Sequence, residues 1–301
     1  MFTNVCCVVL ARRLFRPVHI DIHNIRNINT SRQTLSSFYE SDRKSGYTKS
    51  DKKVSRLELI RNGLKELKKE IFIWKDEIKE KLESDPILIY RPGETDILWK
   101  FDSPHILHQW VTTADSDHKE GYSKCDLNIS ADGTAVFSGS LSCEVPKDGR
   151  IKKSGYCNMK SVRPQKSFKR DAYYNWCMYT HLVLKVRGDG RTYILNLSTA
   201  GYYDIMWNDM YTYVLHTRGG PYWQLTKIPF SKFILASKGR LQDKQCPIPL
   251  DKVTNVGISL GDKINGPFSL ELDYIGLEFD PSHTEEFAYE MYQTPKFLVG
   301  S

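Results

Sequence analysis

Residues 90–281 alternate apolar and polar side chains with a period of two, and this pattern limits the fold more than any other feature of the chain. Such a period is typical of β-strands that bury one face. The alternation is clearest at 125–129, 137–145, 182–187, 211–216 and 268–274. After Tyr274 the apolar positions change parity, to Ile275, Leu277 and Phe279, with Gly276 between them. A change of parity within one strand predicts a β-bulge.

Turn signals separate these segments. The sequences ADGT (131–134), RGDGR (187–191), RGGPY (218–222) and GDKINGPF (261–268) supply the residues that tight turns favour. No convincing helical period lies between residues 90 and 280. Many strands without intervening helices indicate an all-β fold, a sandwich or jelly roll. We expect some nine to eleven strands in a domain at 90–281, followed by a C-terminal tail at 282–301.

The pattern changes to a helical period at residues 55–85, before this domain. Pro86 ends the helical period, because the residue before a proline disfavours helix. Three interpretations stay open: a helix packed on its own domain, a partner-binding or self-associating coiled segment, and a helix lying on a membrane surface. The nearly balanced charge argues against the membrane. Apolar residues spaced by three and four form one stripe on the predicted helix, at Leu57, Ile60, Leu64, Leu67, Ile71, Trp74 and Ile78.

The first 50 residues carry most of the basic excess of the chain. The formal net charge is +7, and residues 1–50 hold eight basic residues against three acidic ones. Up to Ser37 the chain is rich in Arg, contains Ser and Thr, and has one acidic residue, Asp21. This composition predicts a mitochondrial transit peptide at 1–40, followed by a linker at 41–54. A secretory signal and a plain N-terminal tail are the alternatives.

The sequence gives little support for catalysis or metal binding. Two of the seven cysteines, Cys6 and Cys7, lie in the predicted transit peptide. The other five are widely spaced and form no CxxC motif, so a reduced compartment is favoured over a disulfide scaffold or zinc site. His105 and His108 are spaced three apart, as metal ligands can be, but their segment reads as a loop. No GxSxG, HExxH, P-loop or GxGxxG motif stands in the required context. We therefore predict no catalytic residue, no metal and no cofactor, and a protein that is not an enzyme.

A basic segment interrupts the nearly neutral domain. Residues 147–170 contain nine basic residues and one acidic residue, Asp148. The segment is interpreted as a solvated loop, as a site for an acidic protein or an anionic lipid surface, or as an RNA site. No RNA-binding motif accompanies it, so we expect no nucleic acid partner. The basic candidates for a protein interface are Lys152, Lys153, Arg163, Lys169 and Arg170.

Aromatic residues crowd into the segment 202–223. They can form an interface with a protein, a sandwich core, or a sugar-binding face on which flat rings stack. Sugar binding makes a carbohydrate-binding module the alternative function. The aromatic candidates for the interface are Tyr202, Tyr203, Trp207 and Trp223.

Five sequence blocks carry a family resemblance. LVLKVRGDGRTYILNLSTAGYYD (182–204), WQLTKIPFSKF (223–233) and VGISLGDKINGPFSLELDYIGL (256–277) follow FDSPHILHQW (101–110) and AVFSGSL (135–141) in the chain. In this order they resemble the complex I intermediate-associated protein family. The resemblance implies a galactose-binding-like jelly roll, related to carbohydrate-binding modules. Its motif positions here are Arg187, Gly188, Asp189, Gly190 and Arg191, and we expect them to be structural.

The resemblance also implies a function. Family members are non-enzymatic chaperones that assemble mitochondrial respiratory complex I, the NADH:ubiquinone oxidoreductase. The implied partners are intermediates of the membrane arm and other assembly factors, including an acyl-CoA dehydrogenase-like protein. The implied location is the matrix side of the inner membrane, with peripheral membrane association.

Overall fold

The fold is described from a computed structural model of the chain. It describes residues 56–83, 91–147, 149, 151–200, 209–237 and 239–293. The predicted transit peptide and linker lie outside the described residues.

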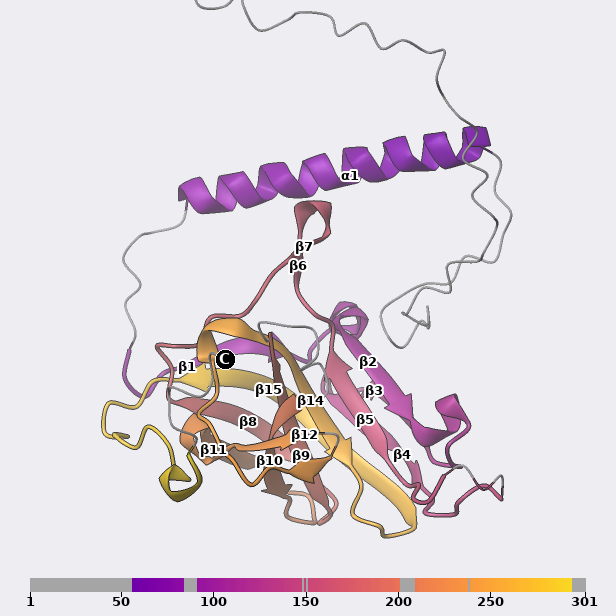
Figure 1. The fold of residues 1–301 in the computed structure, drawn as a ribbon, viewed down its shortest axis with the longest axis vertical. Coiled ribbons are helices and arrows are strands. Elements are labelled where there is room, and N and C mark those ends of the chain that lie inside the picture. The colour runs from indigo at the N-terminus through magenta and orange to yellow at the C-terminus, as the bar shows by residue number, and fades with distance from the viewer. Residues whose placement is uncertain are drawn as a thin grey trace, which may run out of the picture. The chain divides into compact units, whose positions relative to one another are not determined.

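Two antiparallel sheets form the body of the protein (Figure 1). The six-stranded sheet has the order β11 (Gln224–Pro229), β8 (His181–Arg187), β15 (Gly266–Glu278), β4 (Ala135–Leu141) and β3 (Lys124–Ile129), and β1 (Thr95–Lys100) also pairs with β15. The seven-stranded sheet has the order β13 (Arg240–Leu241), β12 (Ile234–Ser237), β10 (Asp209–His216), β9 (Thr192–Thr199), β14 (Val253–Leu260), β5 (Cys157–Ser161) and β2 (Trp110–Ala114). Strands that follow each other along the chain repeatedly change sheet, as β8 and β9 do. This arrangement confirms the predicted all-β jelly-roll sandwich.

Two short elements and six single turns complete the sandwich. Strands β6 (Gln165–Lys166) and β7 (Arg170–Asp171) pair only with each other. The turns are 3₁₀ helices, at η3 (Pro104–Gln109), η4 (Asp115–His118), η5 (Ser167–Lys169), η7 (Phe230–Lys232), η8 (Leu250–Lys252) and η9 (Glu290–Tyr292). The described strands outnumber the nine to eleven that we expected, because strands as short as β12 and β13 have no readable alternation.

The core lies between the two sheets and follows the alternation of the sequence. In β8, Leu182, Leu184 and Val186 are fully buried. They face β9 and β14, where every second side chain is buried as well. Aromatic rings fill one end of the core, where Trp99 meets Trp110 edge-to-face with 5.6 Å between the ring centroids. Four of the five segments predicted from alternation lie within strands, and the fifth, 137–145, is a strand only up to Leu141, where β4 ends.

The predicted β-bulge is confirmed in β15. Its pairing with β8 shifts register between Leu272 and Tyr274. Leu272 and Ile275 are both fully buried, although they are an odd number of residues apart. The bulge therefore lets one long strand keep apolar side chains in the core along its whole length.

Helix α1 (Arg56–Glu83) precedes the sandwich and confirms the predicted amphipathic helix. Its apolar stripe is exposed, with Ile60 and Leu64 each 61% exposed. Among the described residues, no helix is long and apolar enough to cross a membrane.

The chain continues to contact the sandwich beyond β15. Phe287 is buried, and the backbone of Ala288 donates a hydrogen bond to the carbonyl of Ser231 at 3.1 Å. Gln245 forms an isolated bridge with Gln293. Residues 282–293, within the segment expected to be a tail, are thus tied to the domain.

Candidate functional site

The RGDGR motif forms the connection between β8 and β9, where the chain crosses from one sheet to the other. Gly190 has a φ of +90°, a conformation that favours glycine. At Gly188, an added Cβ would lie 2.3 Å from the side chain of Thr217, so the backbone passes too close for any side chain. Both glycines are therefore required by the turn itself.

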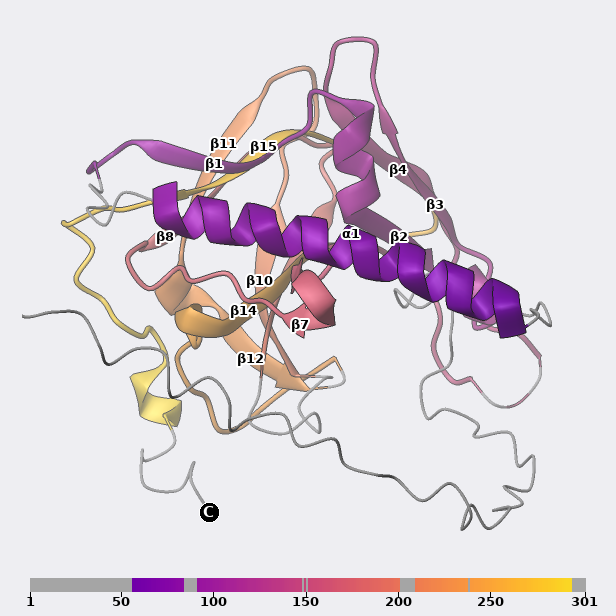
Figure 2. The ribbon, with the colours of Figure 1, turned by 90° about the horizontal axis from the view of Figure 1, so that it is seen from above.

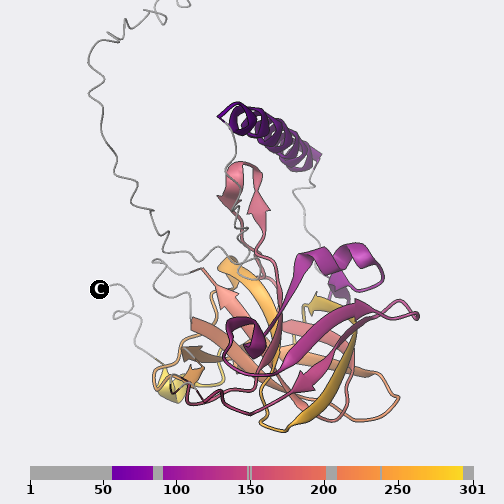
Figure 3. The same ribbon diagram turned by 90° about the vertical axis from the view of Figure 1, so that its right-hand side faces the viewer.

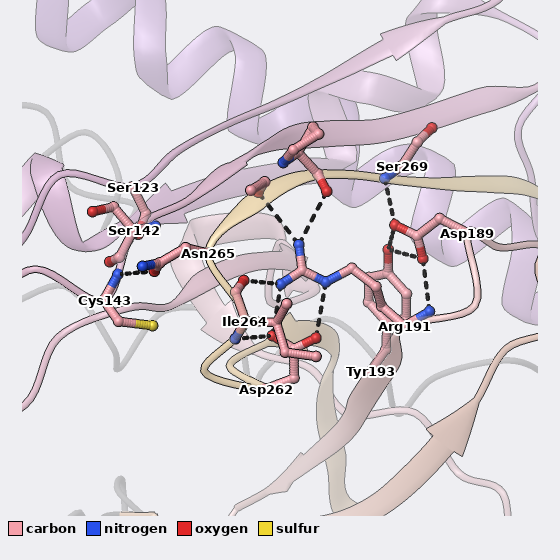
Figure 4. A network of polar contacts seen from close by, with 12 residues as sticks. Ser123, Ser142, Cys143, Asp189, Arg191, Tyr193, Asp262, Ile264, Asn265 and Ser269 are labelled. Carbon is pink, nitrogen blue, oxygen red and sulfur yellow. Dashed lines mark hydrogen bonds and ion pairs between the residues drawn. The ribbon is translucent and has the colours of Figure 1, made fainter.

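Arg191 and Asp189 fasten this turn to the loop between β14 and β15 (Figure 4). Arg191 donates to both carboxylate oxygens of Asp262, at 2.8 and 2.7 Å, and to the carbonyls of Ile264, Gly266 and Pro267. Burial alone raises the pKa of Asp262, but the hydrogen bonds from Arg191 and from the Ile264 amide hold that pKa below its usual value. A buried ion pair whose hydrogen-bond donors are all satisfied holds the segments that it joins in one arrangement. We name Arg191, Asp262 and the carbonyls that Arg191 bonds the Arg191 brace.

Asp189 extends the brace to the adjacent strands. Its carboxylate accepts hydrogen bonds from the backbone N–H of Arg191 at 3.0 Å and of Ser269 at 2.9 Å. The hydroxyl of Tyr193, whose pKa is raised by burial, donates to the same carboxylate at 3.3 Å. These bonds connect β9, the motif and β15.

An open cleft of about 380 Å³ lies on the outer face of the six-stranded sheet. Ion pairs cross its floor, joining Lys185 to Asp273 at 2.6 Å and Arg187 to Glu271. Thr134 donates to the other oxygen of Glu271 at 2.7 Å. The remaining lining residues are Asp132, Gly133 and Trp223. Arg187, the first residue of the motif, therefore belongs to the cleft and not to the brace.

Trp223 is the aromatic candidate that the cleft contains. The cations of Lys185 and Arg187 lie 5.5 and 5.1 Å from its ring, within cation–π distance. Its side chain remains 37% exposed, so part of the ring is open to a ligand. The carboxylates of Glu271 and Asp273 already form ion pairs with Arg187 and Lys185. A ligand that bonds to these carboxylates has to share or replace the ion pairs. Tyr202, Tyr203 and Trp207 lie outside the described residues.

The structure divides the basic segment into two groups. Lys152 and Lys153 are exposed in the loop before β5, whereas Arg163 and Arg170 follow that strand. The five residues of strand β5, which span about 16 Å at roughly 3.3 Å per residue, lie between the two groups in the chain. Arg163 pairs with Asp171 at 3.3 Å. Arg150 and the side chain of Lys169 lie outside the described residues.

Arg170 belongs to a hairpin that contacts α1 (Figures 2 and 3). The hairpin is built from β6, η5 and β7. Glu77 of α1 accepts hydrogen bonds from Arg170 at 2.5 Å and from both the backbone N–H and the hydroxyl of Ser167. Glu70 accepts from the backbone N–H of Phe168 at 2.6 Å. The Ser167 amide, followed by the Ser167 hydroxyl and Arg170, lowers the pKa of Glu77.

Several polar positions escaped the sequence reasoning. The cleft residues Lys185, Glu271 and Asp273 were visible only as outward positions of alternating strands. Glu70 and Glu77 stood out only as charged positions of the predicted helix, outside its apolar stripe. His105 and His108 lie with ring centroids 6.1 Å apart, and no group of three potential metal ligands occurs among the described residues. The five cysteines that the structure describes are free thiols.

The topology defines the class of fold, an all-β jelly-roll sandwich of two antiparallel sheets. A family 11 carbohydrate-binding module from Clostridium thermocellum, solved with a mixed-linked tetrasaccharide, is similar at 14% identity with a TM-score of 0.43, covering 62% of this chain and 96% of the module.

Sequence comparison is more specific. The chain belongs to the Complex I intermediate-associated protein 30 (CIA30) family, whose model matches residues 99–272. It is 54% identical over 88% of its length to the "Complex I intermediate-associated protein 30, mitochondrial" of Drosophila melanogaster, of which it covers 90%. The mouse protein of the same name is 45% identical over 64% of this chain and 59% of its own length. The resemblance inferred from the sequence blocks is thereby confirmed.

Proposed function

We propose that this protein is a non-enzymatic chaperone for the assembly of mitochondrial respiratory complex I. The observation that carries the proposal is the 54% identity, over 88% of the chain, with a fly protein named for its association with complex I intermediates. The names of the fly and mouse relatives describe those proteins as mitochondrial, and the composition of residues 1–40 supports import of this one. Its proposed location is the matrix side of the inner membrane, in peripheral association with it.

Its proposed clients are assembly intermediates of the membrane arm. Its proposed partner proteins are other assembly factors, including an acyl-CoA dehydrogenase-like protein. Deletion of the gene followed by native gel electrophoresis tests the function. Loss of mature complex I with accumulation of membrane-arm intermediates, rescued by the full chain, is the expected result. Normal complex I in the deletion line, with the other respiratory complexes as the internal comparison, contradicts the proposal.

Lys152 and Lys153 are the basic candidates for the protein interface that are exposed and form no ion pair with a described acidic residue. Replacing both with Glu should weaken recovery of the assembly partners more at low salt than at high salt, because exposed charges are screened. The Arg163→Gln variant is the matched comparison, since this residue is already paired with Asp171. Equal recovery of partners by the Lys152/Lys153 variant and the unchanged chain at low salt argues against this interface.

The cleft supports sugar binding as the second candidate function. Trp223 offers a partly exposed ring, on which the apolar face of a sugar can stack, and the Glu271 and Asp273 carboxylates beside it can accept hydrogen bonds from hydroxyls. A glycan array with the full chain tests it, with Trp223→Ala and Tyr222→Ala as a pair, because Tyr222 is exposed but absent from the cleft lining. Glycan binding that Trp223→Ala abolishes and Tyr222→Ala retains would favour the carbohydrate-binding function.

A further inference from the structure

Helix α1 carries an apolar stripe that no described element covers. Its members Ile60, Leu64, Leu67, Ile71, Trp74 and Ile78 are between 39 and 61% exposed. Side chains of the sandwich core, by comparison, are almost completely inaccessible. Contiguous exposed apolar surface of this kind marks an interaction site.

The two flanks of the stripe differ in charge. Because successive residues of an α-helix are rotated by about 100°, Glu70 and Glu77 lie on one flank and Arg61, Lys68 and Lys75 lie on the other. The hairpin holds the glutamate flank through Ser167, Phe168 and Arg170.

The basic flank is open. Among the described residues, no acidic side chain forms an ion pair with Arg61, Lys68 or Lys75. The surface that remains accessible on α1 is therefore the apolar stripe together with a row of three cations.

We infer that this surface binds an amphipathic helix of a partner protein whose facing flank is acidic. The stripe alternates steps of three and four residues, which is the spacing at which two helices interlock their side chains. Opposite charges beside such a seam set the choice of partner. The basic flank thus selects a helix that presents glutamate or aspartate beside its own apolar seam.

A second copy of this chain fits the surface less well. In a parallel pair, the basic flank would have to meet Glu70 and Glu77 of the other copy, and the hairpin already holds those carboxylates. In an antiparallel pair, Lys68 and Lys75 would face the same lysines of the other copy.

A membrane surface fits less well for a related reason. Helices that lie on anionic membranes carry basic residues on both sides of the apolar face. Here Arg61, Lys68 and Lys75 lie on one side, and the other carries Glu66, Glu70 and Glu77 beside Lys81. This asymmetry favours one helix packed along the stripe over a flat anionic surface.

The inference goes beyond the proposed function, because it assigns a partner chemistry to one surface and does not depend on complex I being the client. Its test uses purified full chain and two synthetic helical peptides with the same leucine seam. One peptide has glutamate on both flanks and the other has lysine there. Fluorescence anisotropy of the labelled peptides measures the affinity. We expect the full chain to bind the glutamate peptide at least tenfold more tightly than the lysine peptide.

Two matched pairs of variants locate the binding surface. Ile71→Gln alters the stripe and Ile73→Gln alters another face of the same helix, at nearly equal exposures of 39 and 37%. We expect Ile71→Gln to weaken binding of the glutamate peptide at least tenfold and Ile73→Gln to change it by less than about twofold. The same contrast is expected between Lys68→Glu/Lys75→Glu and Lys65→Glu/Lys69→Glu, which change the net charge equally. Circular dichroism confirms that each variant keeps its helix.

Four results overturn the inference. Equal affinity for the two peptides would show that the basic flank does not select an acidic partner. Equal effects of the two variants in a matched pair would show that the peptide does not bind at the stripe and its basic flank. A dimer in solution that Ile71→Gln dissociates assigns the stripe to a second copy. Flotation with phosphatidylcholine vesicles containing an anionic phospholipid, lost in Ile71→Gln and unaccompanied by peptide binding, assigns it to a membrane. A normal complex I level in the deletion line leaves the peptide result unaffected, so the two proposals fail separately.

Discussion

The ion pair between Arg191 and Asp262 is expected to be one of the main polar contributions to the stability of the sandwich. Both side chains are only 10% exposed, and Arg191 donates to both oxygens of the carboxylate. In Asp262→Asn, the amide keeps the volume and one acceptor but leaves the guanidinium charge unneutralised. Removing one partner of a buried pair costs about 3–5 kcal/mol. Because Arg191 keeps three backbone carbonyls as acceptors, we expect the lower end, about 3 kcal/mol.

Urea and thermal unfolding of the full chain measure this loss. For a domain of this size, about 3 kcal/mol corresponds to a fall in Tm of roughly 6–12 °C. Asp251→Asn is the matched control, because Asp251 lies 3.9 Å from Lys252 and both side chains are more than half exposed. The control should change the free energy of unfolding by less than about 0.5 kcal/mol.

The double variant Arg191→Met/Asp262→Asn measures the interaction between the two side chains separately from their interactions with the rest of the protein. It leaves no buried charge, so its loss should be smaller than the sum of the two single losses by at least about 1 kcal/mol. Additive losses, or an Asp262→Asn loss no larger than that of the control, would refute the reasoning.

The same pair predicts a pH dependence. The folded protein holds the pKa of Asp262 below its usual value of 3.8, although burial alone would raise it. A lowered carboxyl pKa contributes stability above the unfolded value and loses it as the pH falls through the folded one. The free energy of unfolding should therefore decline less steeply below pH 3.8 in Asp262→Asn than in the unchanged chain.

Three further predictions concern other positions. Burial, with the charge of a neighbouring histidine, lowers the pKa of His181 below its usual 6.5, so the stability that the neutral ring contributes should be complete above pH 6.5 and decrease below it. Between pH 7.5 and 5.5, the free energy of unfolding in urea should decrease less in His181→Gln than in the unchanged chain, and an identical decrease would contradict this. Gly188→Ala places a Cβ 2.3 Å from a threonine side chain and should cost about 1–3 kcal/mol in thermal unfolding, whereas Gly219→Ala, with 3.4 Å to its nearest atom, should be nearly neutral. Glu77→Gln should speed hydrogen exchange of the hairpin amides at 165–171, and Glu80→Gln, on another face of α1, should not; equal exchange in both would show that Glu77 does not hold the hairpin.

The fold could be predicted from the sequence as far as local pattern determines it. The side-chain period of a half-buried strand is fixed by the pleat, so each alternating segment contains a strand, although the alternation at 137–145 runs past the end of β4 at Leu141. The bulge in β15 was readable from the parity change between Tyr274 and Ile275, because both halves of one strand have to face the same core. The number of strands was less accessible, since a strand such as β13, with only Arg240 and Leu241, has no period to detect.

The cleft was not predictable for a different reason. Arg187 and Glu271 are 84 residues apart in sequence, and their strands are neighbours only because β15 lies between β8 and β4. Alternation indicates that both side chains point away from the core, but strand order decides which charges meet. The contact of Glu77 with Ser167 has the same origin, because it depends on where a hairpin outside both main sheets reaches α1.

The distribution of charge in the structure changes which surface a partner should recognise. As a sequence, residues 147–170 are the strongest single feature for an acidic partner. In the structure, Arg170 is held by Glu77 of the same chain and Arg163 by Asp171, whereas Lys152 and Lys153, before β5, are exposed and have no ion pair with a described acidic residue. A pair of exposed lysines speeds an encounter more than it stabilises a complex. The stripe on α1 offers what the lysines do not, since apolar area removed from water is the main favourable contribution to most protein association. Recognition should therefore depend on the stripe for affinity and on Arg61, Lys68 and Lys75 for the choice of partner.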